Sequence, residues 1–202
     1  MCIRDSSMNI YQKILDLSNN ATSSEGSIVN VSYRNYDKFI TSNTGGWNDI
    51  DSDLTTGYVV SLTPSSANSK LLIHCYMHIS VDNNDDSRWW GAKLYRKIGT
   101  GDWSEVTGAT NNQTTDRPSG TGCFMASHHQ QGQDTFIQNL SNSYVDDAYD
   151  NTSIHYYTIY WKCRIGADDA NKTIHMNRAD SSTDAFRSLP ISSLVLKEIY
   201  YP

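Results

Sequence analysis

Apolar and polar residues alternate along much of the chain after residue 27. The stretch LLIHCYMHIS places Leu71, Ile73, Cys75, Met77 and Ile79 on one side of an extended strand. A period of two is typical of a strand with one buried face, because successive side chains point to opposite faces. We therefore predict that these five residues face a core, while the more polar residues between them face outward.

The same alternation recurs in other short runs that are separated by turn-rich segments. In WWGAKLYRKIG it places Trp90, Ala92, Leu94 and Ile98 on one face, and in IHYYTIYWKCRIG it places Tyr157, Ile159, Trp161, Cys163 and Ile165 on one face. The run SIVNVSYR places Val29, Val31 and Tyr33 together. About eight to ten such strands with no helical pattern after Ala21 predict an all-β fold, an antiparallel β-sandwich of the jelly-roll kind over residues 27–202.

One stretch has helical spacing. Ile10, Ile14 and Leu17 fall at i, i+4 and i+7 before an Asn-rich stop, which predicts a short N-terminal helix. Such a short helix needs a packing partner, or is the tail of a longer one. Residues 7–26 are thus interpreted as a helix and linker, a possible end of a stalk.

The first six residues have a separate explanation. MCIRDS resembles an open reading frame through the transposase mosaic-end adapter of shotgun sequencing libraries. Residues 1–6 are therefore interpreted as an adapter-derived artefact of a metagenomic fragment, and we expect them to have no function.

Charge and composition narrow the possible partners. The formal net charge is -6 and no run of Lys or Arg is present, so we expect no nucleic-acid partner. No apolar run approaches the ~20 residues of a membrane span, so we expect no membrane insertion. Without Cys2, three cysteines remain with no C-x-x-C spacing, which supports neither zinc nor a disulfide framework.

Two candidate metal motifs fail on spacing. Asp82, Asn84 and Asp86 have the alternate spacing of the oxygen ligands in a calcium-binding loop. However, Ser87 occupies the position where that loop needs glycine, and Lys93 occupies the position of its bidentate Glu. His74 and His78 lie on one strand face about 13 Å apart, too far to share one ion. A metal would need several chains around a threefold axis. We expect no metal and no other cofactor.

Five segments of the chain carry a family resemblance. LTPSSANSKLLIHCYMHIS resembles the "ltPsSasSKilI" strand pair of C-terminal modules in phage tail-fibre and related virion proteins, which are common in marine and cyanophage-like sequences. LYRKIG resembles the "LyRdGt" strand of that family, and SYVDDAYDNTSIHYYTIYWKCR resembles its "flDsPattsaitYtvqyks" segment. TIHMNR and SSLVLKEI resemble "tvyiNrs" and the terminal "SsltvmEI". The resemblance implies a trimeric, jelly-roll-like head at the tip of a fibre, and it carries no catalytic residues.

Aromatic residues beside polar loops are the candidate ligand-binding groups. Aromatic rings stack on sugar faces while amides and carboxylates bind hydroxyl groups. The candidates for glycan or receptor binding are Trp103, Trp89, Asp85, Asp86, Tyr144 and Tyr149. Alternatively, Trp89 and Tyr144 anchor loops to the core or line a subunit interface. The polar segment from Gly99 to Gly122 is either a binding loop or an extra hairpin.

The outward face of LLIHCYMHIS is the candidate trimer interface, through His74, Tyr76 and His78. We expect an extracellular virion protein, a homotrimeric tail-fibre head that adheres to a host-surface glycan or protein. One alternative is a carbohydrate-binding module of a secreted bacterial protein. A capsule depolymerase is a further alternative, but Asp residues occur in every loop and no nucleophile motif appears, so we expect no enzymatic activity.

Overall fold

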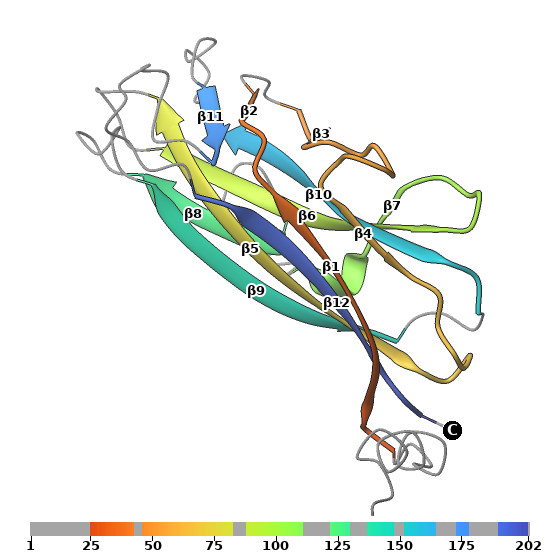
Figure 1. The fold of residues 1–202 in the computed structure, drawn as a ribbon. Coiled ribbons are helices and arrows are strands. Elements are labelled where there is room, and N and C mark those ends of the chain that lie inside the picture. Colours follow the sequence, from red (N-terminus) through yellow and green to blue (C-terminus); the bar gives the residue numbers. More distant parts are fainter. Residues whose placement is uncertain are drawn as a thin grey trace, which may run out of the picture.

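The computed structural model describes residues 25–42, 46–82, 88–110, 122–129, 137–147, 152–164, 173–177 and 190–201. These residues form strands and one short 3-10 helix, η1 (Figure 1). The strands are β1 (Ile28–Tyr36), β2 (Ile40–Ser42), β3 (Asn48–Asp49), β4 (Val59–Leu62), β5 (Lys70–Asp82), β6 (Arg88–Ile98), β7 (Ser104–Glu105), β8 (Met125–His129), β9 (Gln138–Asp146), β10 (His155–Arg164), β11 (Thr173–Met176) and β12 (Ser192–Ile199), and η1 is Thr107–Ala109.

The strands form two antiparallel sheets of six strands each. In the first, which we call the β5 sheet, β12 and β11 pair with β5, β9 pairs with β5, β1 pairs with β12 and β2 pairs with β11. In the second, the β10 sheet, β3, β4 and β6 pair with β10, and β7 and β8 pair with β6. The β5 sheet lies in front of the β10 sheet in Figure 1.

The strand pairing has the nested order of a jelly roll. The first long strand pairs with the last, β1 with β12, and the next pairs inward are β4 with β10, β5 with β9 and β6 with β8. This is a long hairpin rolled into two facing sheets. The predicted jelly-roll β-sandwich is therefore confirmed.

Side chains between the sheets form one core, as the alternation predicted. Leu71, Ile73, Cys75, Met77 and Ile79 of β5 are all fully buried. The predicted faces of β6 and β10 are buried at Trp90, Ala92, Leu94, Tyr157, Ile159 and Trp161. Ile98 is half-buried at the end of β6, and the side chains of Cys163 and Ile165 lie outside the described part of the chain.

Polar contacts join the two sheets at both sides. The carboxylate of Asp146, fully buried on β9, accepts hydrogen bonds from Arg96 Nη1 at 2.7 Å and the Tyr157 hydroxyl at 2.8 Å, both from the β10 sheet. On the opposite side, Arg34 of β1 donates to the carbonyl oxygens of Val59 and Thr55. These bonds satisfy polar groups that burial would otherwise leave costly, so they fix how the sheets face each other.

Several sequence predictions fall outside the described residues. They are the segment 1–6, the helix around Ile10 to Leu17 and the loop 83–87. Part of the Gly99 to Gly122 segment is described: β7 pairs with β6 as a short extra hairpin, and η1 follows it. No helix in the described part of the chain is long and apolar enough to span a membrane.

Candidate binding surfaces

The predicted glycan-binding residues occupy different environments. Trp103 is half-buried one residue before β7, and Tyr144 is half-buried on β9. Trp89 belongs to β6, but its side chain lies outside the described part of the structure, as do Asp85, Asp86 and Tyr149 entirely. Only two of the six candidate side chains are thus described, and these two lie at different sheets, Trp103 beside β7 and Tyr144 on β9.

Tyr144 packs inward, against η1. Its hydroxyl lies so close to Gly108 that a Cβ atom on this glycine would overlap it. Burial raises the pKa of Tyr144, and the carboxylates of Asp146 and Asp147 raise it further. This contact fastens η1 to β9, which corresponds to the anchoring role considered for Tyr144.

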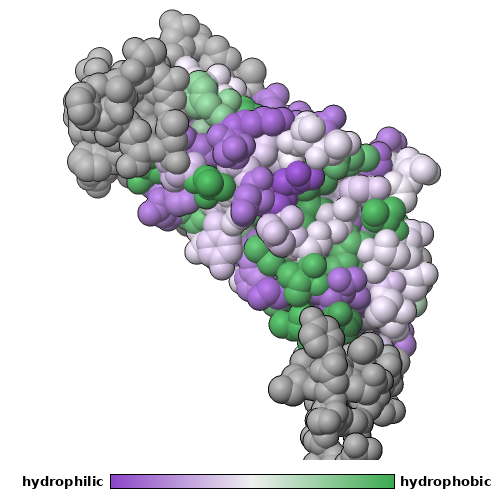
Figure 2. Space-filling view, in the orientation of Figure 1, coloured by the Kyte–Doolittle hydropathy of each residue, from purple (hydrophilic) through white to green (hydrophobic). Residues whose placement is uncertain are grey.

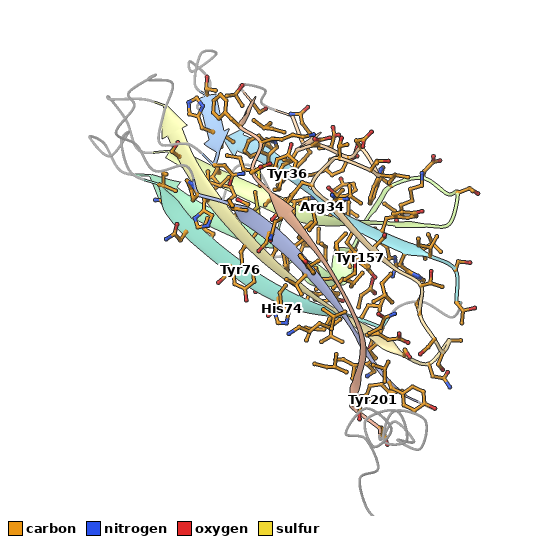
Figure 3. All side chains as sticks on the ribbon, viewed as in Figure 1. Arg34, Tyr36, His74, Tyr76, Tyr157 and Tyr201 are labelled. Carbon is orange, nitrogen blue, oxygen red and sulfur yellow. The ribbon has the colours of Figure 1, made fainter. Side chains whose placement is uncertain are left out.

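The predicted interface residues His74, Tyr76 and His78 lie on the outer face of the β5 sheet. Figure 3 shows His74 and Tyr76 there. Tyr76 is 46% exposed, and His78 Nδ1 lies 2.6 Å from Asn139 Oδ1 on β9. Burial lowers the pKa of His74, and the positive charge of Lys197 lowers it further. These three residues thus share one solvent-facing surface.

Hydrophobic residues gather on the same surface. We call it the open face and define it by Ile28, Val29, Val31, Tyr33, Leu72, Tyr76, Val145, Val195 and Ile199. Tyr33 is 70% exposed and Val31 52%, although both belong to a regular strand. Figure 2 views the molecule from this side, and hydrophobic residues gather there toward the end at which β1 begins. Contiguous exposed apolar residues of this kind mark interaction surfaces.

The outer face of the β10 sheet has a different character. Tyr95 of β6 and Tyr160 of β10 stack on each other, with ring centroids 3.8 Å apart and planes inclined by 21°. Thr158, the register partner of Tyr95, points to the same side and is nevertheless fully buried. Its hydroxyl donates to the carbonyl oxygen of Tyr58 at 2.8 Å. The side chains on this face therefore pack on one another.

Trp47 completes this surface at one end. Continuing the β3–β10 register by one pair places Trp47 opposite Lys162, which is itself opposite Gly91. A Cβ atom on Gly91 would lie 3.4 Å from the Trp47 ring and 2.5 Å from Cys123 Sγ. Only glycine leaves room here for the indole and the thiol to lie against the sheet.

An ion pair between a buried lysine and a partly exposed glutamate supports the indole. Lys93 is 7% exposed, and its Nζ lies 2.7 Å from Glu105 Oε2 and 4.8 Å from the centre of the Trp47 ring. A lysine over an indole face attracts it electrostatically. The Glu105 carboxylate thus fixes the position of the Lys93 ammonium, and the ammonium in turn stabilises the position of the Trp47 ring.

Trp103 and Tyr156 lie at the other end of the surface. Continuing the β6–β7 register places Trp103 opposite Lys97, which pairs with Tyr156. We call Trp47, Tyr95, Trp103, Tyr156 and Tyr160 the aromatic face. Of these, only Trp103 was singled out from the sequence.

Carboxylates border the tyrosine pair. Glu105 is the register partner of Tyr95, and Asp49 is the register partner of Tyr160. Burial raises the pKa of both tyrosines, and Glu105 and Asp49 respectively raise it further. Asp49 Oδ2 accepts hydrogen bonds from the backbone N–H and hydroxyl of Ser52, so its orientation is fixed.

Alternation alone could have identified part of the aromatic face. In LYRK and YYTIYWK, the residues Tyr95, Tyr156 and Tyr160 fall on the side opposite the core residues. Trp47 carried no such signal, because β3 is only two residues long. Among the described residues, no three His, Cys, Asp or Glu side chains lie close enough together to hold a metal ion.

Comparisons with known proteins add a distant structural likeness. No protein-family model matches the chain, and no curated protein does. Among solved structures, it is similar to the CBM22-1 xylan-binding domain from Paenibacillus barcinonensis Xyn10C, with a TM-score of 0.30 and 10% sequence identity over 89% of this chain and 99% of that chain. A likeness this weak carries no functional argument, so function has to be argued from the surfaces themselves.

Proposed function

We propose that this chain is a non-catalytic glycan-binding module that adheres through its aromatic face. The observation that carries the proposal is the stacked pair Tyr95 and Tyr160, with the carboxylates of Glu105 and Asp49 at its edges. The C–H faces of sugar rings stack on aromatic rings, while carboxylates accept hydrogen bonds from sugar hydroxyls. The tyrosines are already fixed by each other, so little side-chain freedom is lost on binding.

The test is glycan binding by a Tyr95→Ala/Tyr160→Ala variant. Aromatic residues at the centre of an interface often contribute 2 kcal/mol or more, so we expect affinity to fall by at least about tenfold. The binding glycan is first found on a glycan array with the full chain, and affinity is then measured by calorimetry. The matched control is Tyr33→Ala, which removes a 70% exposed tyrosine from the other sheet. Equal affinity in the double variant and the control would exclude the aromatic face.

A finer proposal concerns the setting of this module. We propose that it is the extracellular head of a virion tail fibre, a homotrimer in which the open face, with His74, Tyr76 and His78, contacts another subunit. The resemblance of the strand motifs to those of phage tail-fibre modules supports this proposal. The exposed hydrophobic residues that cluster on one face of the β5 sheet support it as well. A free-standing carbohydrate-binding module would instead be monomeric.

Light scattering on the full chain separates these two settings. We expect a trimer for the fibre head, and a clean monomer at micromolar concentration would contradict it. Assaying for released reducing ends during incubation with the bound glycan tests the remaining alternative, because a depolymerase generates them and an adhesion module does not.

A further inference from the structure

The aromatic residues on the β10 sheet occupy three successive levels along its strands. Trp103 and Tyr156 lie at the level of Lys97, Tyr95 and Tyr160 lie near the middle, and Trp47 lies at the level of Gly91. Residues 91 and 97 of β6 are about 20 Å apart at the usual rise of a strand. The aromatic face is therefore longer than any single sugar ring.

At one end of the aromatic face, several contacts fix the side chain of Trp47. The indole lies against Gly91, and Lys93 Nζ lies 4.8 Å from its ring centre. Glu105 holds that ammonium at 2.7 Å, and Lys93 is only 7% exposed. Burying a lysine is costly unless it is paired. Here the pair fixes an indole that is half-buried and still reaches the surface.

We propose that the aromatic face binds an extended oligosaccharide along the direction of β6 and β10, with Tyr95 and Tyr160 holding one sugar and Trp47 holding another further along the same chain. This inference rests on the proposed glycan binding and adds its ligand class: internal segments of linear glycans rather than single terminal sugars. Lys93 is a positioning residue, because it acts on the ligand through Trp47.

Chain length is the variable that tests this inference. The probes are homologous series of β-1,4-linked glucose, xylose and mannose, each from one to six sugars, titrated against the full chain by calorimetry. We expect the affinity for the best series to rise by about tenfold or more from the monosaccharide to the hexamer, because adjacent sugars on one chain bind at high effective concentration.

Trp47→Ala is the decisive variant. It should remove most of the gain in affinity with chain length, because only the part of the aromatic face at Tyr95 and Tyr160 then still holds a sugar. Lys93→Met should give the same pattern, and the two substitutions combined should cost little more than either alone, because both act through one indole. Trp47 and Lys93 effects that simply add would contradict the positioning role.

The outcomes distinguish this inference from the proposal beneath it. Absence of binding to the glycan array and to every member of the three series contradicts glycan binding itself. Binding that is equally tight for one sugar and six, or a Trp47→Ala variant with an unchanged dependence on chain length, contradicts only the extended-chain inference. Circular dichroism of each variant checks that the fold persists, and a variant that loses the fold is replaced by Trp47→Phe, which keeps a ring of smaller area.

Discussion

The two outer faces of the sandwich obey the same alternation and differ in what their side chains contact. On the open face, Val31 and Tyr33 are 52% and 70% exposed. On the aromatic face, Tyr95 stacks on Tyr160 at 3.8 Å and Lys93 is 7% exposed against Glu105. The open face thus leaves apolar side chains exposed to solvent. On the aromatic face, the side chains are held in place by one another even without a ligand. This difference agrees with the two proposals, self-association through the open face and glycan binding through the aromatic face.

The largest effect should come from breaking the ion pair beneath the aromatic face. Glu105→Ala leaves the buried ammonium of Lys93 without its carboxylate, so we expect a loss of about 3 kcal/mol in the free energy of unfolding. Urea denaturation measures it. The matched control is Lys93→Met/Glu105→Leu, which removes both charges and should recover most of the stability. If Glu105→Ala left the free energy of unfolding unchanged, the ion pair of Lys93 and Glu105 would not be what fixes the side chains of the aromatic face.

A smaller effect should follow from adding one methyl group at Gly91. A Cβ there would lie 2.5 Å from Cys123 Sγ. Gly91→Ala should therefore destabilise the fold by about 1 to 2 kcal/mol. In a strand without such a contact, alanine is normally more stable than glycine. Gly91→Ala/Cys123→Ala removes the thiol that meets the new methyl and should restore much of the loss. Thermal unfolding of both variants checks this, and an unrescued double variant would locate the strain elsewhere.

The smallest effect on stability should occur on the open face. Val31→Glu replaces an exposed side chain opposite Lys197, so we expect the free energy of unfolding to change by less than about 0.5 kcal/mol. Association should nevertheless weaken, since a carboxylate now lies in the apolar contact. Light scattering over a concentration series measures it. Unchanged association would remove the open face from any subunit interface.

The sequence predicted the inner faces well and the outer faces poorly, for one physical reason. Burial of Leu71 or Trp90 depends on alternation within one strand, which can be read locally. The contacts of Lys93 depend on which segments lie beside β6, since Glu105 reaches it from β7 and Trp47 from the residue just before β3. Register between strands is set by the whole fold, so the aromatic face could not be assembled from local patterns.

One long-range contact explains part of the motif pattern. Glu198 is fully buried at the end of β12, and its Oε1 accepts hydrogen bonds at 2.6 Å from both the backbone N–H and the hydroxyl of Ser65. These residues belong to the segments LTPSSANSK and SSLVLKEI, and they are 133 residues apart in the sequence. The sequence showed both motifs. It did not show that they meet.

The position of β12 has a consequence for the time course of folding. Although it follows the other described strands in the sequence, it lies between β1 and β5, and Leu196 pairs with Ser32 on one side and Ile73 on the other. The β5 sheet therefore cannot close until β12 has been synthesised. Contacts between residues so distant in sequence form slowly, and during that interval the facing edges of β1 and β5 stay unpaired and prone to aggregation.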